Sequence, residues 1–294
     1  MAELGKACRM TSGRATALGL GAILLWATLA SLTVLSGGLP PFQTTAVAFA
    51  VGGSVIALVA ILRGRWSSML PTPASLALGV YGLFGYHALY FAALRLAPPA
   101  EAHLLNSLWA LFIVLFAALL PGHKLRINHV IGALLGLSAA ALLVWSKGGG
   151  GAAGDSRTLG FALALGCALV WSSYSVASRL LAAVPSESLA VSCLVTALLA
   201  FLCSQVFETW QAPAGLAAWI ALLALGAGPV GAAFLLWDIG MKQGDTSLLG
   251  VLAYASPVLS TGLLISLSLA QPTWALGVAC TLLVAAAAIA TRTQ

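Results

Sequence analysis

Long apolar runs, separated by short breaks of Gly, Pro and charged residues, make up most of the chain. A helix that crosses a bilayer needs about 20 mostly apolar residues, and ten runs of this kind can be delimited. We predict membrane spans at 16–36, 42–62, 74–95, 100–120, 127–146, 158–182, 187–208, 214–240, 246–269 and 272–291. The pattern therefore predicts an all-α integral membrane protein with ten transmembrane helices.

The composition excludes a soluble enzyme. Only 7% of the residues are charged, against about 25% in soluble domains, so the polar groups are too few to cover a surface that faces water. The net charge of +6 does not indicate a nucleic-acid partner, because the basic residues stand singly or in pairs between the apolar runs. Membrane topology explains that placement.

Lysine and arginine are divided unevenly between the two sides of the membrane. With a cytoplasmic N-terminus, alternating spans place ten on the cytoplasmic side: Lys6, Arg9, Arg14, Arg63, Arg65, Lys124, Arg126, Arg179, Lys242 and Arg292. The opposite side receives three: Arg95, Lys147 and Arg157. Positive charges gather on the cytoplasmic side of membrane proteins, so both termini are predicted to be cytoplasmic.

The two halves of the chain match each other. Gly21 and Trp26 correspond to Gly166 and Trp171 at an offset of 145 residues. Each half holds five spans, an odd number, so the second half must insert upside down. We predict an N-terminal five-helix repeat, a Gly-rich linker and an inverted C-terminal five-helix repeat, at 1–147, 148–157 and 158–294 respectively. Inverted repeats are typical of secondary transporters, whose substrate sites lie near the bilayer midplane.

Several local motifs resemble those of the ten-helix drug/metabolite transporter superfamily, whose halves are called EamA repeats. Ala93-Leu94-Arg95-Leu96-Ala97 resembles the superfamily's junction between spans 3 and 4. Leu108-Trp109-Ala110-Leu111 and Ala255-Ser256-Pro257-Val258 also resemble its members. The chain departs from the pattern at Ala110, where the superfamily often has Pro, and at Lys124-Leu125-Arg126, which lacks the usual Glu.

Within this superfamily the chain resembles the YddG-type amino-acid exporters. The resemblance rests on Gly85-Tyr86-His87-Ala88-Leu89-Tyr90-Phe91-Ala92-Ala93-Leu94 and on Asn106-Ser107-Leu108-Trp109, and it covers nearly the whole chain. It implies a secondary transporter of the bacterial inner membrane that exports amino acids, aromatic ones included, and related metabolites. Amphiphilic cations are an alternative class of substrate that the resemblance allows.

Polar residues within the spans are the candidates for substrate binding, because polar groups in hydrocarbon are costly. Tyr86, His87 and Tyr90 fall in span 3, and Asn106 and Trp109 in span 4. An amino acid needs donors and acceptors for its ammonium and carboxylate groups, and aromatic rings attract an ammonium. A hydrogen-bond network between packed helices is the alternative explanation of these residues.

Three further aromatic residues are candidates for the same cavity. Trp26 and Trp171 lie about ten residues into spans 1 and 6, too deep for the interfacial belt in which Trp is usually found. Tyr254 in span 9 is the third candidate. Packing between helices is the alternative for each.

Four charged residues near span ends are candidates for coupling or gating: Glu101, Asp238, Arg95 and Lys242. Glu101 opens span 4, where a negative charge suits a helix N-terminus. Asp238 precedes Lys242 by four residues, in the favourable order for a helical pair. An interfacial charge with a local partner is the alternative to a proton site in both cases.

Other classes of membrane protein lack support in the sequence. A membrane-embedded enzyme would need a catalytic constellation, and neither HExxH, GxSxG nor a P-loop occurs. We therefore expect no enzymatic activity, no metal and no cofactor, with a small-molecule substrate and the lipid bilayer as partners. A scaffold or sensor would not explain the repeat. A sugar-phosphate or nucleotide-sugar carrier needs cavity cations, whereas Arg and Lys are confined to span ends.

Overall fold

The structure, a computed structural model, describes residues 11–118, 127–146, 155–181, 183–244, 249, 252–253 and 255–290. Within these residues it is helical, without strands. The helices of the first half are α1 (Ser12–Ala27), α2 (Leu29–Leu35), α3 (Pro41–Leu62), α4 (Pro73–Val80), α5 (Tyr86–Leu96), α6 (Pro99–Asn106), α7 (Trp109–Ala118) and α8 (Ile127–Ser146). Those of the second half are α9 (Asp155–Ser178), α10 (Leu189–Phe207), α11 (Leu216–Leu225), α12 (Ala233–Gln243), α14 (Ala255–Ser266) and α15 (Trp274–Ala290).

Among the described residues, six helical segments are long and apolar enough to cross a membrane: Ser12–Leu35, Pro41–Leu62, Pro73–Leu96, Ser156–Ser178, Ser186–Phe207 and Leu216–Gly240. Their outward surfaces carry large apolar side chains, such as Leu58 on α3 and Leu198 on α10. Several polar side chains of these segments, among them Thr196 and His87, are buried. This distribution suits a bilayer, where the solvent is as apolar as the core, and it confirms an all-helical membrane protein.

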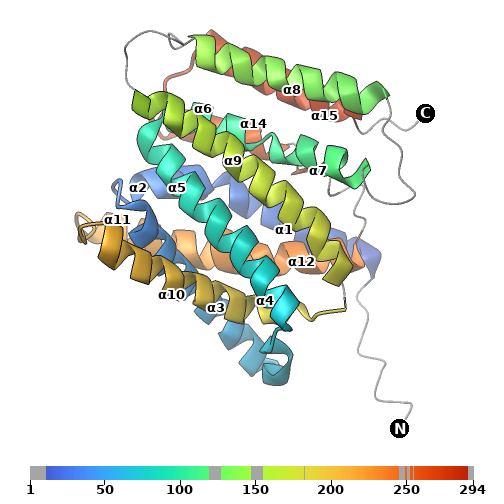
Figure 1. Ribbon diagram of the computed structural model, residues 1–294, viewed down its shortest axis with the longest axis vertical. Helices are drawn as coiled ribbons and strands as arrows, with labels where there is room; N and C mark the ends of the chain where they lie inside the picture. The colour runs from blue at the N-terminus through green and yellow to red at the C-terminus, as the bar shows by residue number, and fades with distance from the viewer. Residues whose placement is uncertain are drawn as a thin grey trace.

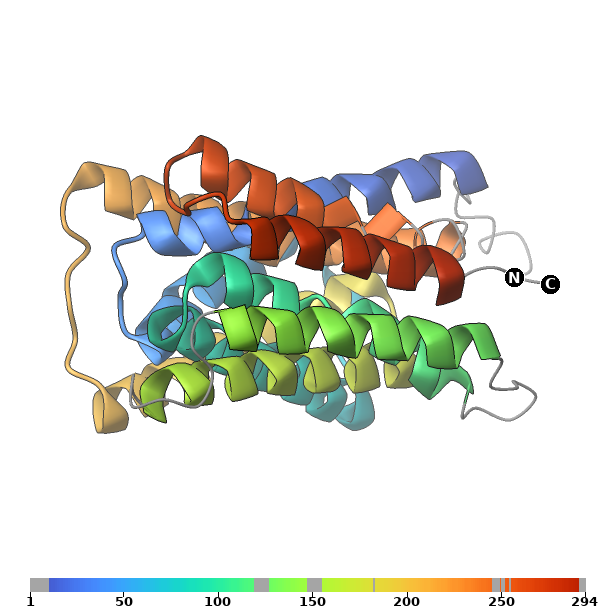
Figure 2. The same ribbon diagram turned by 90° about the horizontal axis from the view of Figure 1, so that it is seen from above.

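The helices pack as pairs that join the two halves of the chain (Figure 1). Helix α8 lies along α15 at one edge of the bundle, and α3 lies along α10 toward the opposite edge. Between these edges, α1 packs against α12 and α5 packs against α9. The start of α1 and the end of α15 lie at the same end of the bundle (Figure 2).

Two helical segments of the bundle, α1–α2 and α6–α7, are each interrupted at a hydroxyl residue. Between α1 and α2, the Thr28 hydroxyl donates to the Leu25 carbonyl oxygen over 2.7 Å. Between α6 and α7, the Ser107 hydroxyl donates to the His103 carbonyl oxygen over 2.8 Å. Such back-bonding competes with the regular backbone ladder and bends helices. The apolar pattern marks spans but not these breaks.

Two other helical segments, α4–α5 and α11–α12, each contain a π-helical turn. The segment η2 (Tyr81–Gly85) joins α4 to α5, and η5 (Gly226–Ala232) joins α11 to α12. Pro229 lies inside η5 and has no backbone N–H to give to a regular α-helix. The Trp26 indole N–H donates to the Pro229 carbonyl oxygen over 3.0 Å, which ties α1 to η5. Single π turns inside α-helices are frequent at functional sites.

Small residues allow α3 to approach η5 at backbone distance. A Cβ added at Gly52 would lie 3.0 Å from both the Gly226 oxygen and the Gly231 nitrogen. A Cβ added at Gly231 would lie 2.9 Å from the Gly52 Cα. Close approach through small residues is the usual way in which helices associate in membranes, and here it fixes α3 against η5.

Polar contacts join α3 and α10 at each end of their pair. The Glu208 carboxylate accepts the Phe42 and Gln43 backbone N–H groups over 2.8 and 2.9 Å, which satisfies the N-terminus of α3. At the other end, Arg65 and Glu187 form a salt bridge of 2.8 Å. We infer that α3 and α10 are held together along their full length.

Candidate substrate-binding site

A cavity of about 30 Å³ lies where the four irregular helical segments described above meet. Its lining residues come from both halves of the chain: Trp26, Leu29, Tyr86, His87, Tyr90, His103, Asn106, Trp109, Trp171, Phe234 and Ser256. Seven of the eight residues that the sequence proposes for substrate binding are in this set. The eighth, Tyr254, lies outside the described residues.

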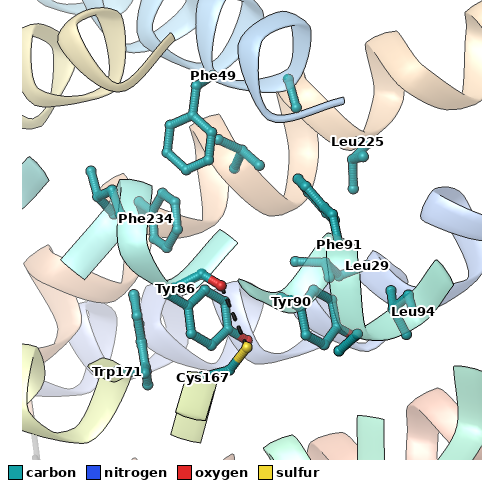
Figure 3. Packing of buried hydrophobic residues seen from close by; sticks show 14 of the residues in the cluster. Leu29, Phe49, Tyr86, Tyr90, Phe91, Leu94, Cys167, Trp171, Leu225 and Phe234 are labelled. Carbon is teal, nitrogen blue, oxygen red and sulfur yellow. Dashed lines mark hydrogen bonds between the residues drawn. The ribbon is translucent and has the colours of Figure 1, made fainter. Parts of the chain in front are cut away.

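Aromatic rings form most of the wall of this central cavity. The Tyr86 ring stacks on the Tyr90 ring, with centroids 5.6 Å apart and planes within 9° of parallel. Trp171 approaches Tyr86 from the opposite side at 5.2 Å, so the Tyr86 ring lies between the other two (Figure 3). Trp26 packs edge-on against Trp171 at 5.7 Å. The wall therefore offers ring faces and edges to an aromatic group or a cation.

Hydrogen bonds hold the polar side chains of the wall in defined positions. The Asn106 amide donates to the Tyr86 hydroxyl over 2.8 Å and so joins α6 to α5. The Tyr90 hydroxyl lies 2.8 Å from His103 Nδ1 and makes a second bond between these helices. His87 Nδ1 lies 3.0 Å from the Leu83 carbonyl oxygen in η2. Each of these side chains is thus fixed on one side only.

The other polar atoms of three of these residues have no partner among the described residues. They are His87 Nε2, His103 Nε2 and Asn106 Oδ1, all buried. A buried polar atom without a hydrogen bond costs about 1–3 kcal/mol, so three of them at one cavity would be an unfavourable way to build a purely structural core. The arrangement matches a site whose hydrogen bonds are completed by a ligand.

Irregular backbone places these side chains at the cavity. Trp26 and Leu29 flank the break at Thr28, and Asn106 and Trp109 flank the break at Ser107. Likewise, Tyr86 and His87 follow η2 directly, and Phe234 follows η5. Discontinuous helices around a midplane site are typical of secondary transporters, and here four irregularities converge on one cavity.

Four lining residues, Leu29, His103, Phe234 and Ser256, were not among the binding candidates from the sequence. A signal for His103 was present, because His103 and Asn106 are three residues apart and share a helical face. Phe234 and Leu29 are apolar and look like ordinary core residues in an apolar chain. Ser256 lies within the motif Ala255-Ser256-Pro257-Val258 but has no distinguishing spacing.

The four charged candidates are not brought together at the central cavity. Glu101 is buried in the first turn of α6, with 4% of its surface exposed, rather than lying at an open interface. Asp238 accepts a hydrogen bond from Ser186 and lines a separate cavity of about 50 Å³ with Tyr174 and Trp237. Arg95 lines a third cavity. Lys242 lies in α12, and its side chain is outside what the structure describes.

Metal-binding geometry is not found in the part of the chain that the structure describes, where no three His, Cys, Asp or Glu side chains gather. The chemistry of the central cavity is that of recognition: aromatic surfaces, two imidazoles, an amide and hydroxyl groups.

A polar and aromatic cavity between interrupted helices is typical of membrane transporters. The EamA-like transporter family matches the chain twice, at residues 14–145 and 158–292. The chain therefore belongs to the EamA-like transporter family.

Individual relatives agree with this assignment. The chain is 50% identical over 283 residues to a protein named aromatic amino acid exporter YddG from Ancylobacter novellus, covering 96% of this chain and 98% of that one. It is 28% identical to a protein of the same name from Salmonella typhimurium, covering 86% and 88% of the two chains. A solved crystal structure with 49% identity superposes with a TM-score of 0.78, covering 95% of this chain and 98% of the other.

Proposed function

We propose that this protein is a secondary transporter that exports aromatic amino acids and related metabolites across a bacterial inner membrane. The observation that carries the proposal is the central cavity, in which aromatic rings surround three buried polar atoms that have no partner among the described residues. An aromatic amino acid supplies the complementary groups: a ring for the walls, an ammonium group for Asn106 Oδ1, and a carboxylate for a protonated imidazole nitrogen. The relatives named above as exporters support this choice.

The binding residues in this proposal are those named from the sequence, extended by three neighbours. Tyr86, Tyr90, Trp26, Trp109 and Trp171 would enclose the ring of the substrate, with Tyr254 as a further candidate. His87 and Asn106 would make polar contacts. Of the four other residues that line the same cavity, His103, Phe234 and Ser256 join the set because their side chains are aromatic or polar.

We further propose ten spans arranged as two inverted five-helix repeats, at 1–147 and 158–294, with a linker at 148–157. The helix pairs support this arrangement: α3 with α10 and α8 with α15 pair corresponding elements, and the α1–α12 contact corresponds to the α9–α5 contact. The π segments also correspond, because η2 begins at Tyr81 and η5 begins at Gly226, an offset of 145. Both termini would be cytoplasmic, in agreement with the charge bias.

Transport would proceed by alternating access around the central cavity. At about 30 Å³, this cavity is far smaller than the roughly 300–1,000 Å³ of ordinary ligand pockets, so substrate binding must displace its wall. The helical segments can bend at four places: the breaks at Thr28 and Ser107, and the π segments η2 and η5. Arg95 and Lys242 would lie at opposite mouths, and Glu101 and Asp238 are the candidates for coupling or gating.

A carrier for amphiphilic cations is the main alternative, since an aromatic cavity also suits such substrates. A sugar-phosphate or nucleotide-sugar carrier has less support, because the lining of the central cavity includes no Arg or Lys among the described residues.

Flux measurements on purified protein in proteoliposomes test the proposal. We expect saturable transport of phenylalanine, tyrosine and tryptophan, measured with and without a pH gradient to reveal coupling to protons. Tyr90→Ala and His87→Ala should each lower this flux by at least roughly tenfold, the value of one or two lost contacts. Tyr81→Ala is the matched control, because Tyr81 lies in the same helical segment as His87 and Tyr90 but is exposed and outside the cavity. Transport of cations but not of aromatic amino acids would overturn the proposal.

A further inference from the structure

A larger cavity, of about 370 Å³, lies beyond the central one. We call it the Arg95 cavity; it is lined by Thr33, Val34, Gly38, Leu39, Thr44, Phe91, Leu94, Arg95 and Pro99. These residues come from α2, the start of α3, the end of α5 and the start of α6, with the loops between them. Its volume lies within the range of ordinary small-molecule pockets.

The Arg95 cavity is the next space along the bundle from the central cavity. On α2, Leu29 lines the central cavity and Thr33, one turn further, lines the Arg95 cavity. On α5, Tyr90 lines the central cavity and Leu94, one turn further, lines the Arg95 cavity. In the topology proposed above, this direction leads to the side of the membrane toward which export runs.

The charge in this cavity is one-sided. Among the described residues that line it, Arg95 is the only charged one. The guanidinium group makes no ion pair with a carboxylate of the described residues. The surrounding wall is apolar at Val34, Phe91 and Leu94. A guanidinium group in a partly apolar setting binds a carboxylate with two parallel hydrogen bonds.

The hydroxyl groups of the cavity complement the other end of an amino acid. The Thr33 hydroxyl donates to the Leu29 carbonyl oxygen over 2.8 Å, and the Thr44 hydroxyl donates to the Pro40 carbonyl oxygen over 3.0 Å. Because both protons are used within the helices, the hydroxyl oxygens remain available as acceptors. An ammonium group has donors only, and therefore fits such oxygens.

The position of Arg95 also suits a purely structural role, in which it binds no ligand. Arg95 lies in the last turn of α5, where any cation interacts favourably with the helix dipole. Lysine would serve that role equally well. Two-pronged binding of a carboxylate requires the planar guanidinium group.

We propose that the Arg95 cavity is a second substrate site, at which an amino acid is held by its carboxylate on Arg95 after it leaves the central cavity and before release. The inference rests on the proposed export of aromatic amino acids. The second site adds a position on the exit path, at which the protein recognises the carboxylate of the substrate.

Protection of a cysteine placed in the Arg95 cavity tests this site directly. Val34→Cys, which lines the cavity but is given no hydrogen bond to the substrate, is reacted with a thiol reagent in nanodiscs, and mass spectrometry reads modification at residue 34 alone. Phenylalanine should slow the reaction, and phenylalaninamide, which lacks the carboxylate, should slow it far less. Adding Arg95→Gln or Arg95→Lys should raise the phenylalanine concentration needed for half protection about fivefold, the value of a partly exposed ion pair. Arg63→Gln, an exposed arginine elsewhere, is the control for total charge.

Equal protection with and without Arg95, or equal protection by phenylalanine and its amide, would overturn the inference. Rescue by Arg95→Lys would also overturn it, because only the helix-dipole role survives that change. Phenylalanine flux measured on the unsubstituted protein in proteoliposomes reports the proposed function separately. Normal flux with Arg95-independent protection refutes the second site alone, whereas absence of flux refutes the exporter.

Discussion

Asn106 offers a sharp separation of binding from packing, because a structural amide and a substrate-binding amide respond differently to Asn106→Leu. The side chain is buried, donates one hydrogen bond to the Tyr86 hydroxyl and leaves Oδ1 without a partner among the described residues. Leucine has a similar size and no polar atoms. The substitution therefore removes one satisfied and one unsatisfied polar group together.

The expected change in stability follows from these two contributions. Loss of Asn106 leaves the buried Tyr86 hydroxyl without this bond and lowers the free energy of unfolding by about 1–3 kcal/mol, and relief of the unpaired Oδ1 raises it by about 1–3 kcal/mol. The two contributions oppose each other, so the net change lies between about −2 and +2 kcal/mol and the stability of the variant should be close to that of the parent. If Oδ1 binds the ammonium group of the substrate, the lost charged hydrogen bond of about 1.5–3 kcal/mol lowers flux roughly 10- to 150-fold.

The assay pairs thermal unfolding in detergent with initial phenylalanine flux below saturation. Thr196→Val is the matched control, because Thr196 on α10 is also buried with an unpaired oxygen among the described residues but lies outside the central cavity. It should gain stability without losing flux. Flux of Asn106→Leu within twofold of the parent, or a loss of stability above about 2 kcal/mol, would refute the binding role.

The helix contacts yield two further predictions. Gly52→Ala should destabilise the protein by about 1–3 kcal/mol, because the new Cβ would lie 3.0 Å from two backbone atoms of η5; its control, Gly262→Ala in α14, has nothing within 4 Å of the new Cβ and should be neutral or stabilising. Glu208→Gln should destabilise by about 1 kcal/mol, because a neutral amide replaces the carboxylate that accepts two backbone N–H groups at the start of α3.

Thermal unfolding in one detergent checks both predictions. Equal unfolding temperatures for Gly52→Ala and Gly262→Ala would contradict the backbone contact between α3 and η5. The effect of Glu208→Gln should shrink as salt is added, because ions screen a partly exposed charge. An effect that is absent or independent of salt would contradict the proposed cap.

The sequence by itself determined that the chain is an all-helical membrane protein and where most helices lie. This was possible because hydrocarbon admits only segments that satisfy their own backbone hydrogen bonds, so apolar length alone marks a helix. It also identified Tyr86, His87, Tyr90 and Asn106 as unusual, since polar side chains in a span are costly wherever they point. These are local properties, readable residue by residue.

Which polar groups meet, and which remain unpaired, was decided only by the tertiary structure. The bond between Tyr90 and His103 joins different helices, and nothing in the spacing of the sequence measures that distance. Phe234 is apolar like its neighbours, and only the packing of α12 against α1 brings it to the cavity wall. Glu101 has the sequence context of an interfacial charge, yet the helices around it bury it.

The helix irregularities also depended on tertiary contacts. Hydropathy gave continuous spans across η5 and Thr28, because side-chain polarity does not report backbone strain. A backbone interruption in a membrane is tolerated only where neighbouring groups satisfy the carbonyl oxygens that it frees, as the Trp26 indole does for Pro229. Partners of this kind lie far away in the chain, so the structure alone decided that the interruptions meet around one cavity.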